Sequence, residues 1–329
     1  MHKPGIINIL IAMALWTVAA MGCTGRFLAL PAPPAVNRTE HVAVVTVAEK
    51  DTLESLALTY LGDAGEAWQI AQYNQVRSAQ AGRRLVIPLQ PVAPGGVRLD
   101  GYQVVPILCY PRIGQEKGVS TRIFEGQVQF LRENGYETIS LERLSAFLNL
   151  CAPLPPKAVL ITLDSAESWV YESAYPILKR NGFTAAIFVP TAQIGKPRRL
   201  SWRELAAMAA EGFDIGTSGV SDPLMKNTAK KKPKDYLRGL EEDIALSKKA
   251  IVRNLNIAPT YFAYPGGQTN DQFICLLKKH GYSGALTQEP GENPFFADNF
   301  KLRRTIVSGR DSGERFQQSL TTFHPADLR

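Results

Sequence analysis

The feature of this sequence that most constrains its fold is an alternation of short apolar runs with amphipathic segments, which continues from residue 102 almost to the end of the chain. An apolar run such as 158–163 has the composition of a strand that is buried on both faces. Alternating strands and helices predict a parallel sheet or barrel whose functional site lies on the loops after the strands. The predicted strands are 104–109, 137–140, 158–163, 184–189, 213–217, 260–263, 283–286 and 304–307. The predicted helices are 124–134, 141–148, 169–180, 202–211, 236–254 and 272–280, and Gly135, Gly182 and Gly281 end three of them.

The first residues have the form of a secretory signal peptide. Lys3 precedes the uncharged apolar stretch 6–20, which is too short for a comfortable membrane span. The following Met21-Gly22-Cys23 resembles a bacterial lipobox. We therefore predict a signal peptide over residues 1–22 and a lipidated Cys23 that anchors an exported lipoprotein on the periplasmic side of the cell envelope, in the outer membrane by analogy. Simple cleavage that leaves Cys23 as a free thiol is the alternative.

The charge of the chain argues against nucleic acid as a partner. The net charge of +7 is modest for 329 residues, and the lysine-rich run 226–234 has no interleaved aromatic residues. Nucleic acid is therefore not an expected partner.

The cysteines of the large domain have separate predictions. Cys109 lies in an apolar run and is predicted to be a small buried side chain. For Cys151 and Cys275, a disulfide between them is one option.

Proline and glycine mark two boundaries in the chain. A Pro/Ala-rich segment follows the signal peptide and predicts an extended, lipidated tether over residues 23–41. A second such segment predicts a linker over residues 90–101. Between them, residues 42–89 are predicted to form a strand, two helices and a closing strand, with Asp51 and Glu54 capping the first helix. Residues 102–329 are predicted to form the large α/β domain.

The small module resembles a LysM domain. The likeness rests on Asp51-Thr52-Leu53, on Ile70-Ala71 followed by Asn74, and on Gly82 with Leu85-Val86-Ile87-Pro88. The resemblance implies a shallow glycan groove at Asp51, Thr52, Leu53, Gln75 and Val76. Its implied ligand is peptidoglycan or another polymer that contains N-acetylglucosamine.

The stretch around Asp164 carries a second resemblance. Asp164-Ser165-Ala166 directly follows the predicted strand 158–163, so Asp164 lies where α/β enzymes place catalytic groups. Together with the stretches 214–223 and 262–267, it is similar to the motifs of the polysaccharide deacetylase (NodB-homology) family. The resemblance covers nearly all of residues 102–320 and implies a distorted, incomplete β/α barrel.

The resemblance also shows what this chain lacks. In the family, the first motif supplies a general base and one metal ligand, and the second motif supplies two histidine ligands. Carried over, the base position is Asp164, whereas the ligand positions hold Ser165, Ser218 and Asp222. Zinc prefers thiolate, imidazole and carboxylate ligands. We therefore predict that the catalytic metal is lost and that the chain binds no cofactor.

The third motif predicts one wall of the cleft. Tyr264 and Pro265 belong to it, and Tyr264 either stacks on a sugar ring or packs within the turn. His280 and His324 are the histidines of this domain, and neither occupies a ligand position. Of the two, only His324 is a candidate for the catalytic acid.

Three functions remain open from the sequence. The first is a pseudoenzyme of the cell envelope that binds N-acetylglucosamine-containing glycan through the LysM module and the barrel. The second is an active polysaccharide N-deacetylase whose metal site, for zinc or another divalent ion, is rebuilt around Asp164 and Asp222 through oxygen ligands. The third is an anchored spacer whose barrel docks a protein partner.

Overall fold

The computed structural model describes residues 37–39, 41–89, 94–98, 100–114, 118–221 and 233–328. The predicted signal peptide, Cys23 and Asp222 lie outside these residues. Within the described part of the chain, no helix is both long and apolar enough to cross a membrane.

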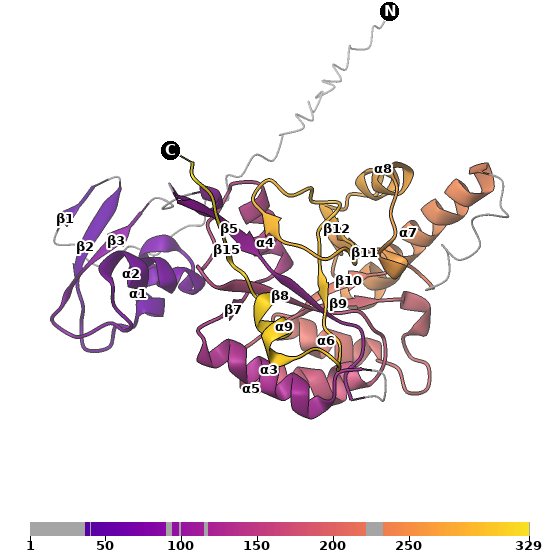
Figure 1. The fold of residues 1–329 in the computed structure, drawn as a ribbon, viewed down its shortest axis with the longest axis horizontal. Coiled ribbons are helices and arrows are strands. Elements are labelled where there is room, and N and C mark those ends of the chain that lie inside the picture. The colour runs from indigo at the N-terminus through magenta and orange to yellow at the C-terminus, as the bar shows by residue number, and fades with distance from the viewer. Residues whose placement is uncertain are drawn as a thin grey trace, which may run out of the picture.

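The N-terminal module has the predicted strand–helix–helix–strand order, preceded by one short strand (Figure 1). Its three strands form an antiparallel sheet in the order β1-β2-β3. The Asn74 side chain joins the second helix to this sheet, because it donates to the carbonyl of Val86 and accepts from the Val86 N–H. The elements are β1 (Asn37–Arg38), β2 (Val42–Thr46), α1 (Leu53–Leu61), α2 (Ala67–Asn74) and β3 (Arg84–Pro88).

The predicted cap of the first helix is wrong by one residue. Thr52 is the N-cap of α1, and its side chain accepts from the N–H of Ser55, whose hydroxyl accepts from the N–H of Thr52 in turn. The carboxylate of Asp51 instead accepts from the N–H of Ala48 at 2.7 Å, which closes the turn before the helix. Both residues favour N-caps, so the backbone of the turn decides between them.

The large domain is built on a curled parallel sheet, as predicted. Its strand order is β12-β11-β10-β9-β8-β6-β14, and β7 also pairs with β8. The strands are β6 (Ile107–Tyr110), β7 (Glu137–Thr138), β8 (Ala158–Leu163), β9 (Ala186–Val189), β10 (Asp214–Thr217), β11 (Tyr261–Ala263), β12 (Gly284–Leu286) and β14 (Thr305–Ile306). Among the described strands, β12 and β14 are the two ends of this order and do not pair, which agrees with an incomplete barrel.

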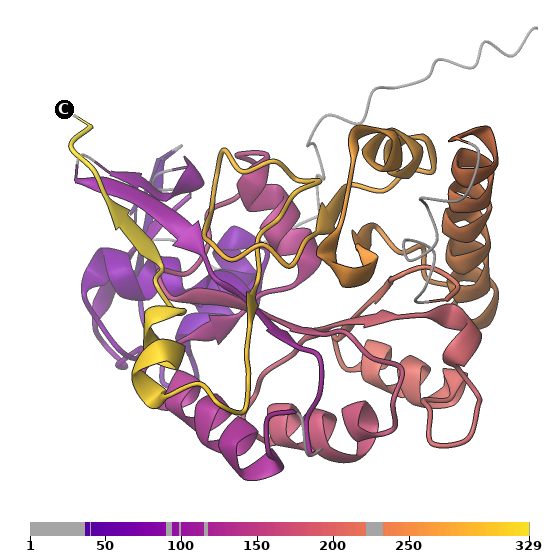
Figure 2. The same cartoon turned by 45° about the vertical axis from the view of Figure 1, so that its right-hand side comes forward.

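Helices cover the outside of this sheet (Figures 1 and 2). They are α3 (Thr121–Glu133), α4 (Leu141–Leu148), α5 (Tyr175–Arg180), α6 (Trp202–Ala210), α7 (Pro233–Leu255), α8 (Asp271–Lys279) and α9 (Gly313–Gln318). The predicted helix 169–180 begins with a π-helical turn at Val170–Ala174. Pro176, at the start of α5, has no N–H to donate, which disturbs the helical hydrogen bonds at this point.

The predicted strand 104–109 is two strands. Pro106 separates β5 (Gly101–Val105) from β6, because proline cannot donate to a ladder. The two parts belong to different sheets: β6 enters the parallel sheet, while β5 pairs antiparallel with β4 (Val97–Arg98), β13 (Asn293–Pro294) and β15 (Phe323–Pro325).

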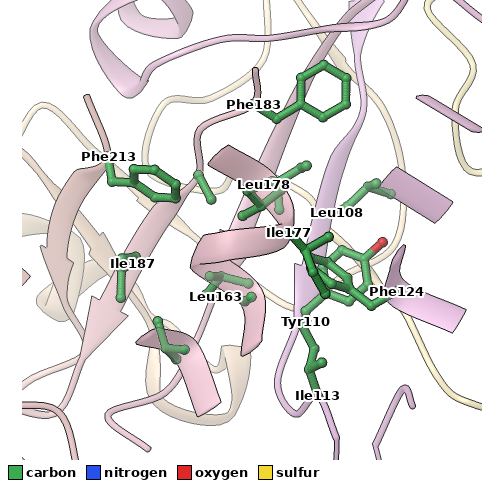
Figure 3. Packing of buried hydrophobic residues seen from close by; sticks show 14 of the residues in the cluster. Leu108, Tyr110, Ile113, Phe124, Leu163, Ile177, Leu178, Phe183, Ile187 and Phe213 are labelled. Atoms are coloured by element: carbon green, nitrogen blue, oxygen red, sulfur yellow. The ribbon is translucent and has the colours of Figure 1, made fainter. Parts of the chain in front are cut away.

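The main core lies between the sheet and helices α3, α5 and α6 (Figure 3). Leu108, Leu163 and Ile187 project from neighbouring strands toward Phe124 of α3 and Ile177 of α5. These side chains are at most 3% exposed. Burial on this scale holds the strands in register and thereby positions the loops at their C-terminal ends.

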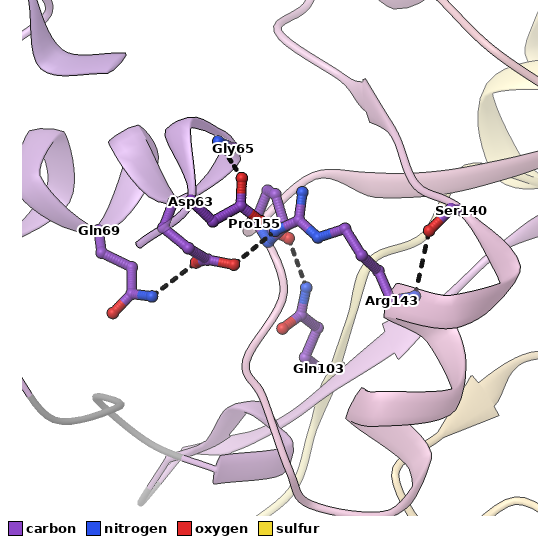
Figure 4. Close-up of polar contacts among 8 residues, drawn as sticks. Asp63, Gly65, Gln69, Gln103, Ser140, Arg143 and Pro155 are labelled. Carbon is purple, nitrogen blue, oxygen red and sulfur yellow. Dashed lines mark hydrogen bonds and ion pairs between the residues drawn. The ribbon is translucent and has the colours of Figure 1, made fainter. Parts of the chain in front are cut away.

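The two modules contact each other through a polar cluster (Figure 4). Arg143 of α4 forms an ion pair of 2.9 Å with Glu66, which precedes α2. Glu66 also accepts from the Gln69 side chain at 2.6 Å. Both members of the ion pair are mostly buried, with side-chain exposures of 25% and 13%. The N-terminal module is thus joined to the outside of the barrel by side chains as well as by the linker.

Candidate functional site

A cleft of about 710 Å³ opens at the C-terminal ends of the parallel strands. The loops after β6, β8, β9, β10 and β11 all contribute to it, as expected for a β/α barrel. The lining residues are Pro111, Arg112, Asp164, Ser165, Ala166, Glu167, Pro190, Gln193, Arg199, Ser218, Tyr264, Pro265, Gly266, Gln268 and Gln288. The fold therefore brings Asp164, Ser165, Ser218, Tyr264 and Pro265 together, as the sequence predicts.

Asp164 is held by a buried arginine. Its Oδ1 accepts from Nη1 of Arg304 at 2.7 Å, and Arg304 is fully buried whereas the Asp164 side chain is 16% exposed. Arg304 also donates to the Thr287 carbonyl and to the Thr162 hydroxyl. Burial by itself lowers the pKa of Arg304, but the attraction to Asp164, the nearby Cys109 and the hydrogen bond to Asp164 together raise it, and the net shift is upward. Asp164 is therefore the anion that compensates a buried charge.

Cys109 lies beneath the same pair. It is fully buried in β6, and burial together with the negative charge of Asp164 raises the pKa of its thiol to about 12. A thiol held neutral in this way is a small packing group rather than a nucleophile. The predicted role of Cys109 agrees with this environment.

The two serines face the cleft as neutral hydroxyl groups. The Ser165 oxygen accepts from the N–H of Glu167 at 3.0 Å and so shapes the turn after β8. The Ser218 backbone N–H donates to the Val189 carbonyl at 3.1 Å, which continues the ladder between β10 and β9. Glu167 forms an ion pair of 2.8 Å with Arg199 at the cleft wall.

Comparison with known proteins relates this geometry to a family. The sequence profile named Polysaccharide deacetylase matches residues 152–285. Bacillus subtilis YxkH, whose name places it among the polysaccharide deacetylases, is 30% identical over 214 residues, which are 64% of this chain and 74% of that protein. This chain belongs to the polysaccharide deacetylase family. A poly-β-1,6-N-acetyl-D-glucosamine N-deacetylase of Staphylococcus aureus is 26% identical over 217 residues, with 64% of this chain and 74% of that enzyme covered.

Two solved structures share the fold of the large domain. IcaB from Ammonifex degensii superposes with a TM-score of 0.60 at 26% identity, over 67% of this chain and 96% of that one. The Streptococcus pyogenes deacetylase PplD, in complex with acetate, gives the same TM-score at 23% identity, over 66% of this chain and 98% of that one. The matches support the predicted deacetylase-like barrel.

The cleft residues that the structure describes do not fit the divalent metal that the family implies. No group of three or more His, Cys, Asp or Glu side chains that could hold a metal occurs among the described residues. The described ligand positions carry the hydroxyls of Ser165 and Ser218, and the neighbouring Asp164 is paired with Arg304. Neutral hydroxyl groups are poor zinc ligands.

Asp243 is a site residue that the sequence did not reveal. It lies on α7, is 7% exposed, and its carboxylate accepts from the Val220 N–H at 2.9 Å and also from the Ser221 N–H. Gly219 allows this approach, since a Cβ there would lie 2.2 Å from an Asp243 oxygen. Asp243 thus braces the loop that carries Ser218. An aspartate within a long amphipathic helix gives no signal of this contact in the sequence.

The environment of Asp243 predicts a pH dependence of stability. Burial raises its pKa from 3.8 to about 6. The folded state therefore binds the proton more tightly than the unfolded state, and stability falls as pH rises from about 4 to about 6, by up to about 3 kcal/mol. We expect Asp243→Asn to remove this fall, because the amide is neutral throughout. Urea denaturation at pH 4, 5, 6 and 7 measures it. The exposed Glu133→Gln is the control, and an Asp243→Asn variant with the unaltered pH profile would refute the assignment.

Tyr264 lines the cleft, but its ring belongs to the core. The residue is 1% exposed, its hydroxyl donates to the Phe300 carbonyl at 2.9 Å, and its ring packs edge-on against Phe273. Of the two predicted roles of Tyr264, stacking on a sugar or packing within the turn, the structure has the packed one. The adjacent Gly266 is exposed and has a φ of 63°, so the backbone here forms the wall.

His280, His324 and Cys275 do not line the cleft. His324, on β15, stacks on Tyr102 at 5.0 Å and does not line the cleft. His280 is the C-cap of α8, with its Nε2 3.4 Å from Glu241. Cys275 is a free, exposed thiol, so the suggested Cys151–Cys275 disulfide is wrong.

The candidate glycan residues of the N-terminal module lie at two helix ends. Asp51 and Thr52 precede α1, while Gln75 and Val76 follow α2. Gln75 has a left-handed φ of 53° and an exposed side chain, and the N–H of Val76 donates to Ala71. Leu53 is 6% exposed and belongs to the core of the module, so only its backbone is available to a ligand.

Arg304 is the most important residue whose role the sequence analysis missed. A signal for it did exist, because an arginine begins the predicted strand 304–307. A buried charge needs a partner, and Asp164 is the carboxylate at the end of a neighbouring buried strand. The register that brings the two together is a property of the folded sheet alone.

Proposed function

We propose that this chain is a cell-envelope protein that binds an N-acetylglucosamine-containing glycan with a deacetylase-fold barrel that no longer deacetylates. The observation that carries the proposal is that hydroxyl groups replace metal ligands in a cleft that the barrel still forms at the C-terminal ends of its strands. Ser165 and Ser218 face the cleft beside Asp164, and the surrounding wall keeps amide and charged groups that suit a sugar polymer. A barrel that had lost its function by drift would be expected to lose this wall as well.

The N-terminal module extends the proposal. Its strand–helix–helix–strand order and the exposed turn at Gln75 support a LysM domain that binds the same class of glycan. A lipid on Cys23 would hold both modules at the periplasmic face of the outer membrane. Peptidoglycan is the polymer that such a position would offer.

Calorimetric titration with oligomers of N-acetylglucosamine tests the proposal. We expect the full chain to bind them with a Kd in the range of about 10 μM to 1 mM, because shallow glycan grooves bury little surface. We also expect no acetate release and no stoichiometric metal by elemental analysis. Bound divalent metal together with acetate release would show an active deacetylase with a rebuilt site instead.

A matched pair of variants locates the binding. Gln193 and Gln268 both line the cleft, so the double change Gln193→Ala and Gln268→Ala is expected to weaken oligomer binding about tenfold through lost hydrogen bonds. Gln129→Ala, on the exposed face of α3, is the control. Unchanged binding in the double variant would favour a spacer whose N-terminal module does all the binding.

A further inference from the structure

A second cavity lies between the two modules. It has a volume of about 450 Å³ and is lined by α2 on one side and by β4, β5, β15 and residues 153–157 on the other. It shares no lining residue with the barrel cleft among the residues described. This inter-module pocket is not explained by deacetylase chemistry.

The walls of the inter-module pocket are built by specific contacts. The buried Gln103 side chain donates to the Pro155 carbonyl at 2.6 Å, which ties β5 to the loop before β8 (Figure 4). Gly96 approaches Gln103 so closely that a Cβ there would lie 2.3 Å from the Gln103 Cβ. On the opposite wall, Gln69 of α2 donates to Glu66, which is paired with Arg143 of α4. A pocket that is already shaped loses little entropy when it binds a ligand.

The lining combines aromatic rings with polar groups. Trp68 and Tyr73 come from α2, and Phe323 comes from β15. Tyr73 is 50% exposed, and Gln72 beside it is also exposed. Aromatic rings pack on the C–H faces of sugar rings, and side-chain amides bond their hydroxyl and acetamido groups. The combination suits a pyranose.

The charged residues of the lining indicate which charge a ligand would carry. Its charged residues are Arg98 and Lys157, and no described carboxylate lines the pocket. Arg98 lies 5.1 Å from the centre of the Phe323 ring and donates to Asp100 through Nε and Nη2, each at 3.0 Å. Both members of this pair are about 60% exposed, at 61% and 60%, so the pair itself stabilises the fold little.

Each cation keeps donors for a ligand. The fork to Asp100 leaves Nη1 of Arg98 without a partner among the described residues. Lys157 donates to the Asn134 carbonyl at 2.8 Å, and an ammonium group has three donors. The two cations therefore offer hydrogen bonds to an anion beside the aromatic rings.

We propose that the inter-module pocket is a second saccharide site, which selects an amino-sugar unit that carries a carboxylate, such as N-acetylmuramic acid. The inference rests on the proposed function and specifies its substrate class. It implies that the chain prefers a glycan with acidic units over neutral poly-N-acetylglucosamine. Because both modules line the pocket, the ligand bridges them.

Two disaccharides that differ only in charge test the inference. The full chain is titrated calorimetrically with N-acetylglucosaminyl-N-acetylmuramic acid and with the same disaccharide whose carboxylate is a carboxamide. We expect the acid to bind about tenfold more tightly, because charge-assisted hydrogen bonds exceed neutral ones. Arg98→Gln is expected to abolish most of this preference, whereas Arg122→Gln, an equal loss of charge on the exposed face of α3, leaves it intact.

The outcomes separate the inference from the proposed function. Equal affinity for the acid and the carboxamide overturns the inference, as does an acid preference that survives Arg98→Gln combined with Lys157→Gln. If chitobiose and both disaccharides bind equally well, the inference fails and the proposed function stands. If none of them binds, and N-acetylglucosamine oligomers also fail to bind, both fail. Unchanged thermal unfolding of the exposed Arg98→Gln variant shows that it is folded.

Discussion

Asp164→Asn is expected to lower the free energy of unfolding by about 3 kcal/mol. The change removes the only charged partner that the described residues give to Arg304, which is fully buried. An uncompensated buried charge costs about 3–5 kcal/mol, and the lower end applies because Asp164 retains some contact with solvent. Urea denaturation at pH 7 measures the change.

A double-variant cycle isolates the cause. Arg304→Met by itself leaves Asp164 unpaired, whereas Asp164→Asn with Arg304→Met replaces the ion pair by neutral groups. We expect the double variant to lose less stability than the sum of the two single variants, since the penalty of each single change is the charge left behind. Glu125→Gln, which breaks an exposed ion pair with Arg180, is the control and should have no measurable effect. Additive losses in the cycle would contradict direct coupling between Asp164 and Arg304.

The second large effect is a gain of metal binding. The triple change Ser165→Asp, Ser218→His and Asp222→His restores the family's ligand types at the positions that the resemblance identifies. Ser165 and Ser218 already line one cleft with Asp164, although Asp222 lies outside the described residues. We expect the variant to bind stoichiometric zinc, and its unfolding free energy to rise by about 2.7 kcal/mol at a zinc concentration of 100 times the Kd.

Chelation and a neutral variant control this experiment. A chelator should return the triple variant to its metal-free stability, and zinc should leave the unaltered chain unchanged. The variant Ser165→Ala, Ser218→Ala and Asp222→Ala should gain no stability from zinc. If the triple variant takes up no zinc, the loop after β10 has moved away from the ligand geometry, and the alignment of the second motif is wrong. The hydrogen bond from the Val220 N–H to Asp243 fixes this loop, so a change in its position would be sought there first.

Much of the fold follows from local patterns in the sequence. The strand 158–163 and the helix 141–148 occur as predicted, because each is a single apolar or amphipathic run with a clear cap or stop. The helix predicted over 202–211 also occurs, and Ser201 and Glu204 form a capping box at its start. Local chemistry fails where neighbours compete, as with Asp51 and Thr52, or where one proline divides an apolar run, as at Pro106.

Some features of the candidate site follow from the sequence, and others follow only from the tertiary structure. That Asp164, Ser165 and Ser218 share one cleft follows from strand order, since each comes at or just after the C-terminal end of a parallel strand. Strand order and residue spacing are therefore enough to predict that these three residues line one cleft. The pairing of Asp164 with Arg304, the brace from Asp243 and the pocket between the modules depend on distances between residues far apart in the chain. Such contacts are set by sheet register and helix packing, which no local pattern encodes, so they become visible only in the folded protein.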